Sequence, residues 1–166
     1  MNITNSDAPV PNVSLSEARQ WLRERIDEGQ NCPCCGQHTK IYKRALASSL
    51  AAALMGLYRL SRNDRQFYHV NDILAAAQLP STVGREFSII RYWGLTVEKQ
   101  KNEDDDKRSS GYWAITDTGI AFVEKKISIQ SHVHLYNAEV LGFGDERVTI
   151  DDCLRKKFSY EDLMAD

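Results

Sequence analysis

The strongest constraint in this sequence is the order of helix and strand signals in its middle third. Residues 67–70 form a short β-type run, and Asn71 is placed to cap a helix that Pro80 then stops. A second helical pattern covers residues 81–93, and Gly94 supplies the left-handed residue that typically ends a helix. Two helices joined by a tight turn, with β-type sequence on both sides, predict a small domain of mixed helix and sheet.

The flanking segments extend this pattern. Residues 95–101 alternate as a strand, residues 102–111 are a polar loop, and residues 112–116 return as a second strand before a closing helix over 117–126. A long helix predicted over residues 43–61 precedes them and is apolar on almost every side. A helix of that kind is central or lies in an interface, so it could also form the seam of a homodimer.

Across residues 42–126, this order of elements resembles the winged helix-turn-helix superfamily of bacterial and phage regulators. Residues 89–95 (IIRYWGL) are similar to the usual end of a recognition helix in that superfamily, and residues 112–119 (YWAITDTG) to the passage from a wing strand to the closing helix. The resemblance implies that the loop 102–111 is the wing. The cysteine-rich turn, the module over 42–126 and the glycine-rich hairpin beyond it also look similar to uncharacterised small proteins of tailed bacteriophages.

We therefore expect an α+β fold in which a winged helix-turn-helix core carries an N-terminal helix, a cysteine-rich turn, a C-terminal β-hairpin and short helices. Four segments follow from this expectation. They are a flexible arm (1–13), the N-terminal helix and cysteine-rich turn (14–41), the winged-helix domain (42–126), and the hairpin with a helical tail (127–166).

The second helix of the pair is the candidate DNA-reading element. An α-helical wheel for residues 81–93 places Phe87 and Ile90 toward the core. The opposite face then carries four polar or aromatic residues, namely Ser81, Arg85, Ser88 and Tyr92. Arginine can pair with guanine in the major groove, and hydroxyl groups can hold phosphates or base edges. The wing adds Lys99, Lys101, Lys107 and Arg108 as phosphate contacts. Duplex DNA is the first expected partner, which makes a transcription regulator, encoded by a phage or prophage, the first hypothesis.

The distribution of acidic side chains is also compatible with a protein partner. Residues 41–126 hold 13 basic and 10 acidic side chains, whereas residues 127–166 hold 4 basic and 8 acidic ones. Four consecutive acids, Glu103, Asp104, Asp105 and Asp106, occupy the expected wing tip and would repel phosphate. The tip could project away from DNA, bind a basic surface of a host protein as an inhibitor or adaptor would, or remain a solvated loop.

The turn Cys32-Pro33-Cys34-Cys35-Gly36 matches the pattern of a zinc knuckle. In such a turn, two cysteines two residues apart, here Cys32 and Cys35, hold one side of a tetrahedral zinc. His38 is the nearest third ligand, and no fourth is evident among Cys34, His69, His132, His134 and Cys153. A cysteine-rich turn without metal is the alternative, and a redox role has less support because no helix begins at the motif.

Enzymatic and membrane functions find no support in the sequence. It contains no phosphate-cradling glycine loop, no metalloprotease helix and no Gly-x-Ser-x-Gly elbow. The apolar residues within 46–58 are too few to span a bilayer, and the N-terminus shows no secretory signal. We expect a cytoplasmic, non-enzymatic protein.

Overall fold

The computed structural model describes residues 12–101 and 109–165 of the chain. Its helices are α1 (Leu15–Glu24), η1 (Ile26–Glu28), α2 (Ser48–Leu60), α3 (Val70–Ala76), η2 (Ser81–Trp93), α4 (Asp117–Val123), α5 (Ile150–Leu154) and α6 (Tyr160–Met164), of which η1 and η2 are 3-10 helices. Its strands are β1 (Gln30–Asn31), β2 (His38–Thr39), β3 (Tyr42–Ala45), β4 (Tyr68–His69), β5 (Thr96–Glu98), β6 (Tyr112–Ile115), β7 (Ile129–Gln130), β8 (His132–Tyr136), β9 (Glu139–Phe143) and β10 (Arg147–Val148). The fold is a mixture of helix and sheet, which confirms the expected α+β class.

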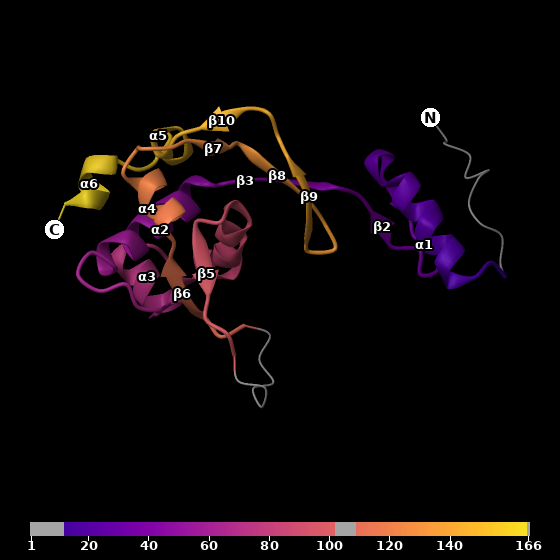
Figure 1. Ribbon diagram of the computed structural model, residues 1–166, viewed down its shortest axis with the longest axis horizontal. Helices are drawn as coiled ribbons and strands as arrows, with labels where there is room; N and C mark the ends of the chain where they lie inside the picture. Colours follow the sequence, from indigo (N-terminus) through magenta and orange to yellow (C-terminus); the bar gives the residue numbers. More distant parts are fainter. Residues whose placement is uncertain (1–11, 102–108, 166) are drawn as a thin grey trace.

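Helix α2 is the centre of the molecule. Every residue from Leu50 to Leu57 is buried, and most of them are fully inaccessible. Helices α3, η2, α4, α5 and α6 all contact α2, and Figure 1 shows them gathered around it. A helix that is apolar on every side requires such complete coverage. Because the same chain supplies the cover, these residues are not exposed to form the homodimer seam considered from the sequence.

Helices α2 and α3 are in close contact at Gly56. A Cβ atom at this position would lie 2.6 Å from the carbonyl oxygen of Ile73 and 2.9 Å from the Cβ of Ala77. The backbone of α3 therefore lies directly against α2, and only glycine leaves room for it. The space beside Gly56 is filled here by α3.

A three-stranded antiparallel sheet packs beside these helices in the order β4-β6-β5. The strands on either side of the loop 102–111 pair as predicted, with Thr96 opposite Ile115. Phe87 of η2 is 1% exposed and packs edge-to-face on Trp113 of β6, with ring centroids 5.5 Å apart. This aromatic pair joins η2 to the sheet.

A second sheet, ordered β3-β8-β9, corrects the predicted start of the long helix. Lys43 and Arg44 were expected to be helical, but they lie in β3 and pair with His134 and Val133 of β8. Helix α2 begins only at Ser48. Pairing with a strand about ninety residues away overrides a local helical preference, which is a weak influence. The expected hairpin turns at Asn137 and Ala138, whose φ angles are 49° and 61°.

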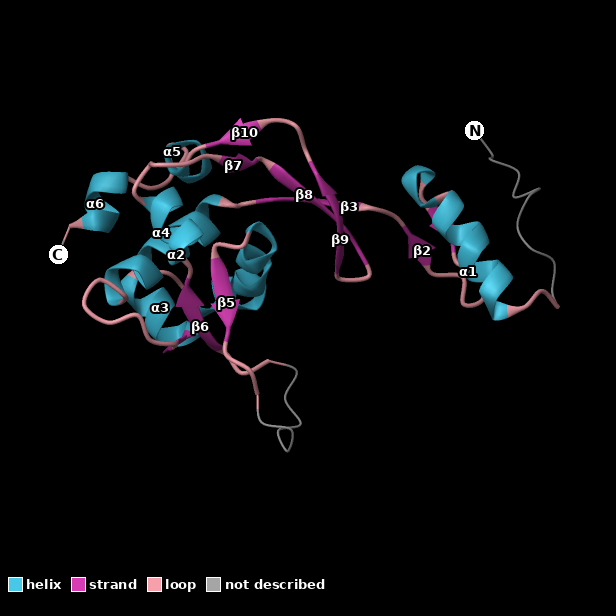
Figure 2. Cartoon of the chain, in the orientation of Figure 1, coloured by secondary structure: helices cyan, strands magenta, loops and turns pink. Residues whose placement is uncertain are grey.

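The N-terminal helix and the cysteine-rich turn form a separate small unit. Ser14 and Glu17 make a capping box at the start of α1, and α1 buries Ala18 and Leu22. Strands β1 and β2 form the arms of the cysteine turn. Figure 2 shows this unit beyond the sheet β3-β8-β9, at the end of the molecule opposite α6. Among the described residues, no helix has both the length and the hydrophobicity needed to cross a bilayer.

Replacement of Gly56 by alanine tests the contact between α2 and α3. Alanine favours helix formation, but its methyl group would meet the backbone of α3, so Gly56→Ala should destabilise the fold by about 1–3 kcal/mol. The measurement is the midpoint of urea unfolding. Gly142→Ala is the matched control, because nothing lies within 4 Å of a Cβ there. Equal midpoints for both variants would contradict this account of the core.

Candidate nucleic-acid interface

Helix η2 is a 3-10 helix over thirteen residues, and this changes which side chains share a face. A 3-10 helix has three residues per turn, so residues three apart lie above one another. The buried residues Phe87, Ile90 and Trp93 have that spacing. The inward-facing side of the helix is therefore a straight ridge, in agreement with the predicted burial of Phe87 and Ile90.

The remaining residues of η2 form two further ridges. Arg85, Ser88 and Arg91 lie on one of them, with Arg85 and Arg91 exposed and Ser88 half-buried. Tyr92 lies on the other, and its hydroxyl donates to the carbonyl oxygen of Ala138 in the β8–β9 turn, 3.4 Å away. The 3-10 period thus places Arg85 and Ser88 on one ridge, as predicted, and places Arg91 on the same ridge. Tyr92 lies on a different ridge. The α-helical wheel missed Arg91, although the three-residue spacing of Phe87, Ile90 and Trp93 was visible in the sequence. Ser81, at the exposed start of η2, falls on the line of the buried ridge.

Glu98 connects this ridge to the stem of the loop 102–111. Its carboxylate accepts a hydrogen bond from Arg91 Nη1 at 3.3 Å and one from the backbone amide of Ser110 at 3.0 Å. The hydroxyl of Ser109 also donates to Glu98. The last turn of η2 and both sides of the stem are therefore held by one carboxylate.

A basic and aromatic surface follows on the strands. Lys99 and Lys101 are exposed, and the backbone amide of Lys99 donates to the carbonyl of Tyr112 at 2.9 Å. The ammonium group of Lys99 lies 5.7 Å from the centre of the Tyr112 ring, and the His69 ring packs against that ring at 5.1 Å. Lys99 and Tyr112 alternate with Glu98 and Trp113, so they point to the side of the sheet away from η2. We use the name basic face for the candidate DNA contacts on η2 and on the strands beside it, which are Arg85, Ser88, Arg91, Lys99, Lys101 and Tyr112. The other predicted residues of this loop, Glu103, Asp104, Asp105, Asp106, Lys107 and Arg108, lie outside the described residues.

The cysteine turn has the backbone geometry of a thiolate cradle. The amide of Cys32 donates to Gln37 O at 2.7 Å, and the amide of Gly36 donates to Cys32 O at 2.8 Å. The chain thus folds back over Cys32, with Gly36 at a φ of +73°. The amides of Cys34 and Cys35 both donate toward the Cys32 sulfur, and this lowers the pKa of the Cys32 thiol.

The other candidate ligands lie elsewhere. The Nδ1 atom of His38 lies 3.1 Å from Oδ1 of Asn31, and its Nε2 side packs over Gly29. Cys153 is buried in the main core, where desolvation raises its pKa to about 11. Within residues 12–101 and 109–165, no three His, Cys, Asp or Glu side chains converge as a metal site would require. In the described structure, Cys32 and Cys35 are therefore not joined by His38.

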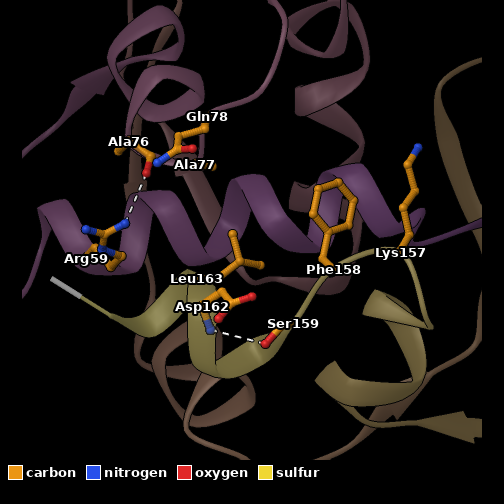
Figure 3. Close-up of a pocket in the computed structure, with 9 residues that line it drawn as sticks. All are labelled: Arg59, Ala76, Ala77, Gln78, Lys157, Phe158, Ser159, Asp162 and Leu163. Atoms are coloured by element: carbon orange, nitrogen blue, oxygen red, sulfur yellow. Dashed lines mark hydrogen bonds between the residues drawn. The ribbon is translucent and has the colours of Figure 1, made fainter.

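A recess lies where α6 meets α2 and α3 (Figure 3). Its volume is about 330 Å³, and Phe158 and Leu163 supply its apolar lining. The guanidinium of Arg59 donates to the carbonyl of Ala76 at the end of α3, 3.2 Å away. That bond satisfies a carbonyl that α3 cannot pair internally. The polar contacts of the recess hold helix ends in place: Arg59 bonds to the end of α3, and Ser159 accepts from the amide of Asp162 at the start of α6.

The cysteines should differ in their reaction with iodoacetamide, because the thiolate is the nucleophile. Cys32 has a lowered pKa, whereas desolvation and the neighbouring Cys32 raise the pKa of Cys34. As the pH rises from 6 to 9 on folded, reduced protein, Cys32 should be modified at a lower pH than Cys34, and buried Cys153 should be modified last. Peptide mass spectrometry gives the order. Modification of Cys34 before Cys32 would contradict the described geometry.

Comparison with known proteins adds no relative to this description: no protein-family model, no curated protein and no solved structure matches the chain.

Proposed function

We propose that residues 42–126 form a winged helix-turn-helix module that binds duplex DNA. The supporting observation is the arrangement of elements: α3 and η2 pack on α2 beside an antiparallel sheet ordered β4-β6-β5, and the loop 102–111 joins β5 to β6. In this arrangement η2 is the recognition helix and the loop is the wing. The same scaffold can serve other functions, so the proposal depends on the basic face that it carries.

The basic face provides two kinds of contact. Arg85 and Ser88 would read base edges in the major groove, and Arg91 extends their ridge by one further turn. Two 3-10 turns separate Arg85 from Arg91 by about 12 Å, which corresponds to roughly three to four base pairs. Lys99 and Lys101 would contact phosphates beside the groove, and Tyr112 offers an exposed ring next to them. Ser81 and Tyr92 remain candidate contacts at the two ends of η2.

A protein partner is the second candidate. Arg91 is paired with Glu98, and Arg44 of β3 lies 3.8 Å from Glu86 of η2. These carboxylates partly neutralise the positive charge that DNA binding needs. The acidic run 103–106 and the acidic residues of 127–166 would instead suit a basic surface of a host protein.

Replacement of Arg85 by alanine tests base reading. The preferred DNA sequence is first selected from a random pool with the purified full chain. Arg85→Ala should then weaken binding to that sequence by about tenfold or more and relax the preference at one position, since a bidentate contact contributes roughly 1–3 kcal/mol. Arg23→Ala, an exposed arginine of α1 at the far end of the molecule, is the control. Failure to select any sequence, together with binding that does not respond to salt, would remove the DNA proposal.

Replacement of Lys99 by alanine tests phosphate contact. Lys99→Ala should weaken binding equally on all sequences and reduce the slope of log affinity against log salt by about one. Fluorescence anisotropy between 50 and 200 mM salt provides the slope. Lys156→Ala removes an exposed lysine near α5 and should leave it unchanged. If Lys99→Ala leaves the salt slope unchanged and a host protein copurifies stoichiometrically with the chain, the protein-partner hypothesis replaces the DNA-binding hypothesis.

A further inference from the structure

The cysteine turn has half of the ligands of a tetrahedral thiolate site. Cys32 and Cys35 have the two-residue separation at which both sulfurs can reach one ion. The amides of Cys34 and Cys35 point toward the Cys32 sulfur, so the backbone is arranged for a thiolate before any ion arrives. The side chains of Cys34 and Cys35 both hydrogen-bond to Cys32, and the two-residue separation is what favours Cys35 over Cys34 as the second ligand.

No other ligand completes the site within the described part of one chain. His38 is turned toward Asn31 and Gly29, and among the described residues outside the turn no His, Cys, Asp or Glu converges with the two cysteines. A closed structural zinc site takes four ligands. Two thiolates per chain therefore account for half of one site.

The position of the turn allows a second copy to supply the other half. Cys35 is exposed and Cys32 is only partly buried. The unit formed by α1, β1 and β2 projects beyond the sheet β3-β8-β9, away from the helices around α2 (Figure 1). Two chains can therefore bring their cysteine turns together while their larger parts stay apart. Arg19 of α1 acts electrostatically on Cys34, so a positive charge lies beside the turn. That charge favours a centre of four thiolates and one divalent cation, whose net charge is −2.

We propose that Cys32 and Cys35 of two chains together bind one zinc ion, so that the metal links two copies of this protein through their N-terminal units. Each chain contributes two thiolates and releases their protons on binding, and no electron is transferred. Soft thiolate ligands in a tetrahedral arrangement select zinc among the common divalent cations. The linkage does not depend on DNA binding, although it would place two DNA-binding modules in one particle.

The experiment titrates the reduced, metal-free full chain with Co²⁺ and then with Zn²⁺, without DNA. We expect cobalt–thiolate absorption bands that saturate at one metal per two chains, with a doubling of mass by light scattering that a chelator reverses. Cys32→Ser and Cys35→Ser should each abolish both signals, whereas Cys34→Ser should retain them. Circular dichroism of each variant verifies that its fold is intact.

Four outcomes would overturn the proposal. One is saturation at one metal per chain with unchanged mass, which would mean that the same chain supplies the remaining ligands. A second is the absence of cobalt–thiolate bands at any metal concentration. A third is a dimer that forms without metal or that only a reductant dissociates, which would indicate a disulfide or another interface. A fourth is a Cys34→Ser variant as defective as the other two.

Discussion

The structure depends first on the burial of α2. An uninterrupted inaccessible run from Leu50 to Leu57 requires neighbours on all sides, and the chain supplies them from five helices that are widely spaced in sequence. Gly56 makes one of these contacts very close, because it lets the backbone of α3 lie against α2. Helix α3 also contacts η2, whose Phe87 packs on Trp113 of the sheet.

The end of η2 shows how the rest of the molecule orients the basic face. Three consecutive residues are each held by a different part of the chain. Arg91 bonds to Glu98 of β5, Tyr92 to Ala138 in the β8–β9 turn, and Trp93 Nε1 donates to the carbonyl of Gln130 in β7 at 2.7 Å. These contacts come from opposite sides of the helix. They fix its rotation, and with it the direction in which the Arg85 ridge faces.

The polar and reactive groups are divided between two regions of the molecule. The basic face belongs to the part built on α2, whereas the cysteine turn belongs to the small unit that precedes β3. Strand β3 connects them and is itself held by β8 through the pairing of Tyr42 to Ala45. This arrangement separates a surface suited to an anionic partner from a thiol pair suited to a soft cation, so each can be altered without disturbing the other.

Local chemistry was enough to predict several parts of this fold. The left-handed Gly94 with a φ of 69° and the strands on either side of the loop 102–111 both follow from residues close together in sequence.

Tertiary structure decided what depends on distant partners. Lys43 and Arg44 lie in a strand because the backbone of β8 pairs with them. Helix α3 packs directly on α2 because Gly56 leaves room for its backbone. The helical period of η2 was decided in the same way: local preference does not separate three residues per turn from 3.6, whereas packing of Phe87, Ile90 and Trp93 in one line does. The sequence alone therefore determined the order of the elements and the types of residue each element carries. Long-range packing determined which of those residues lie near one another.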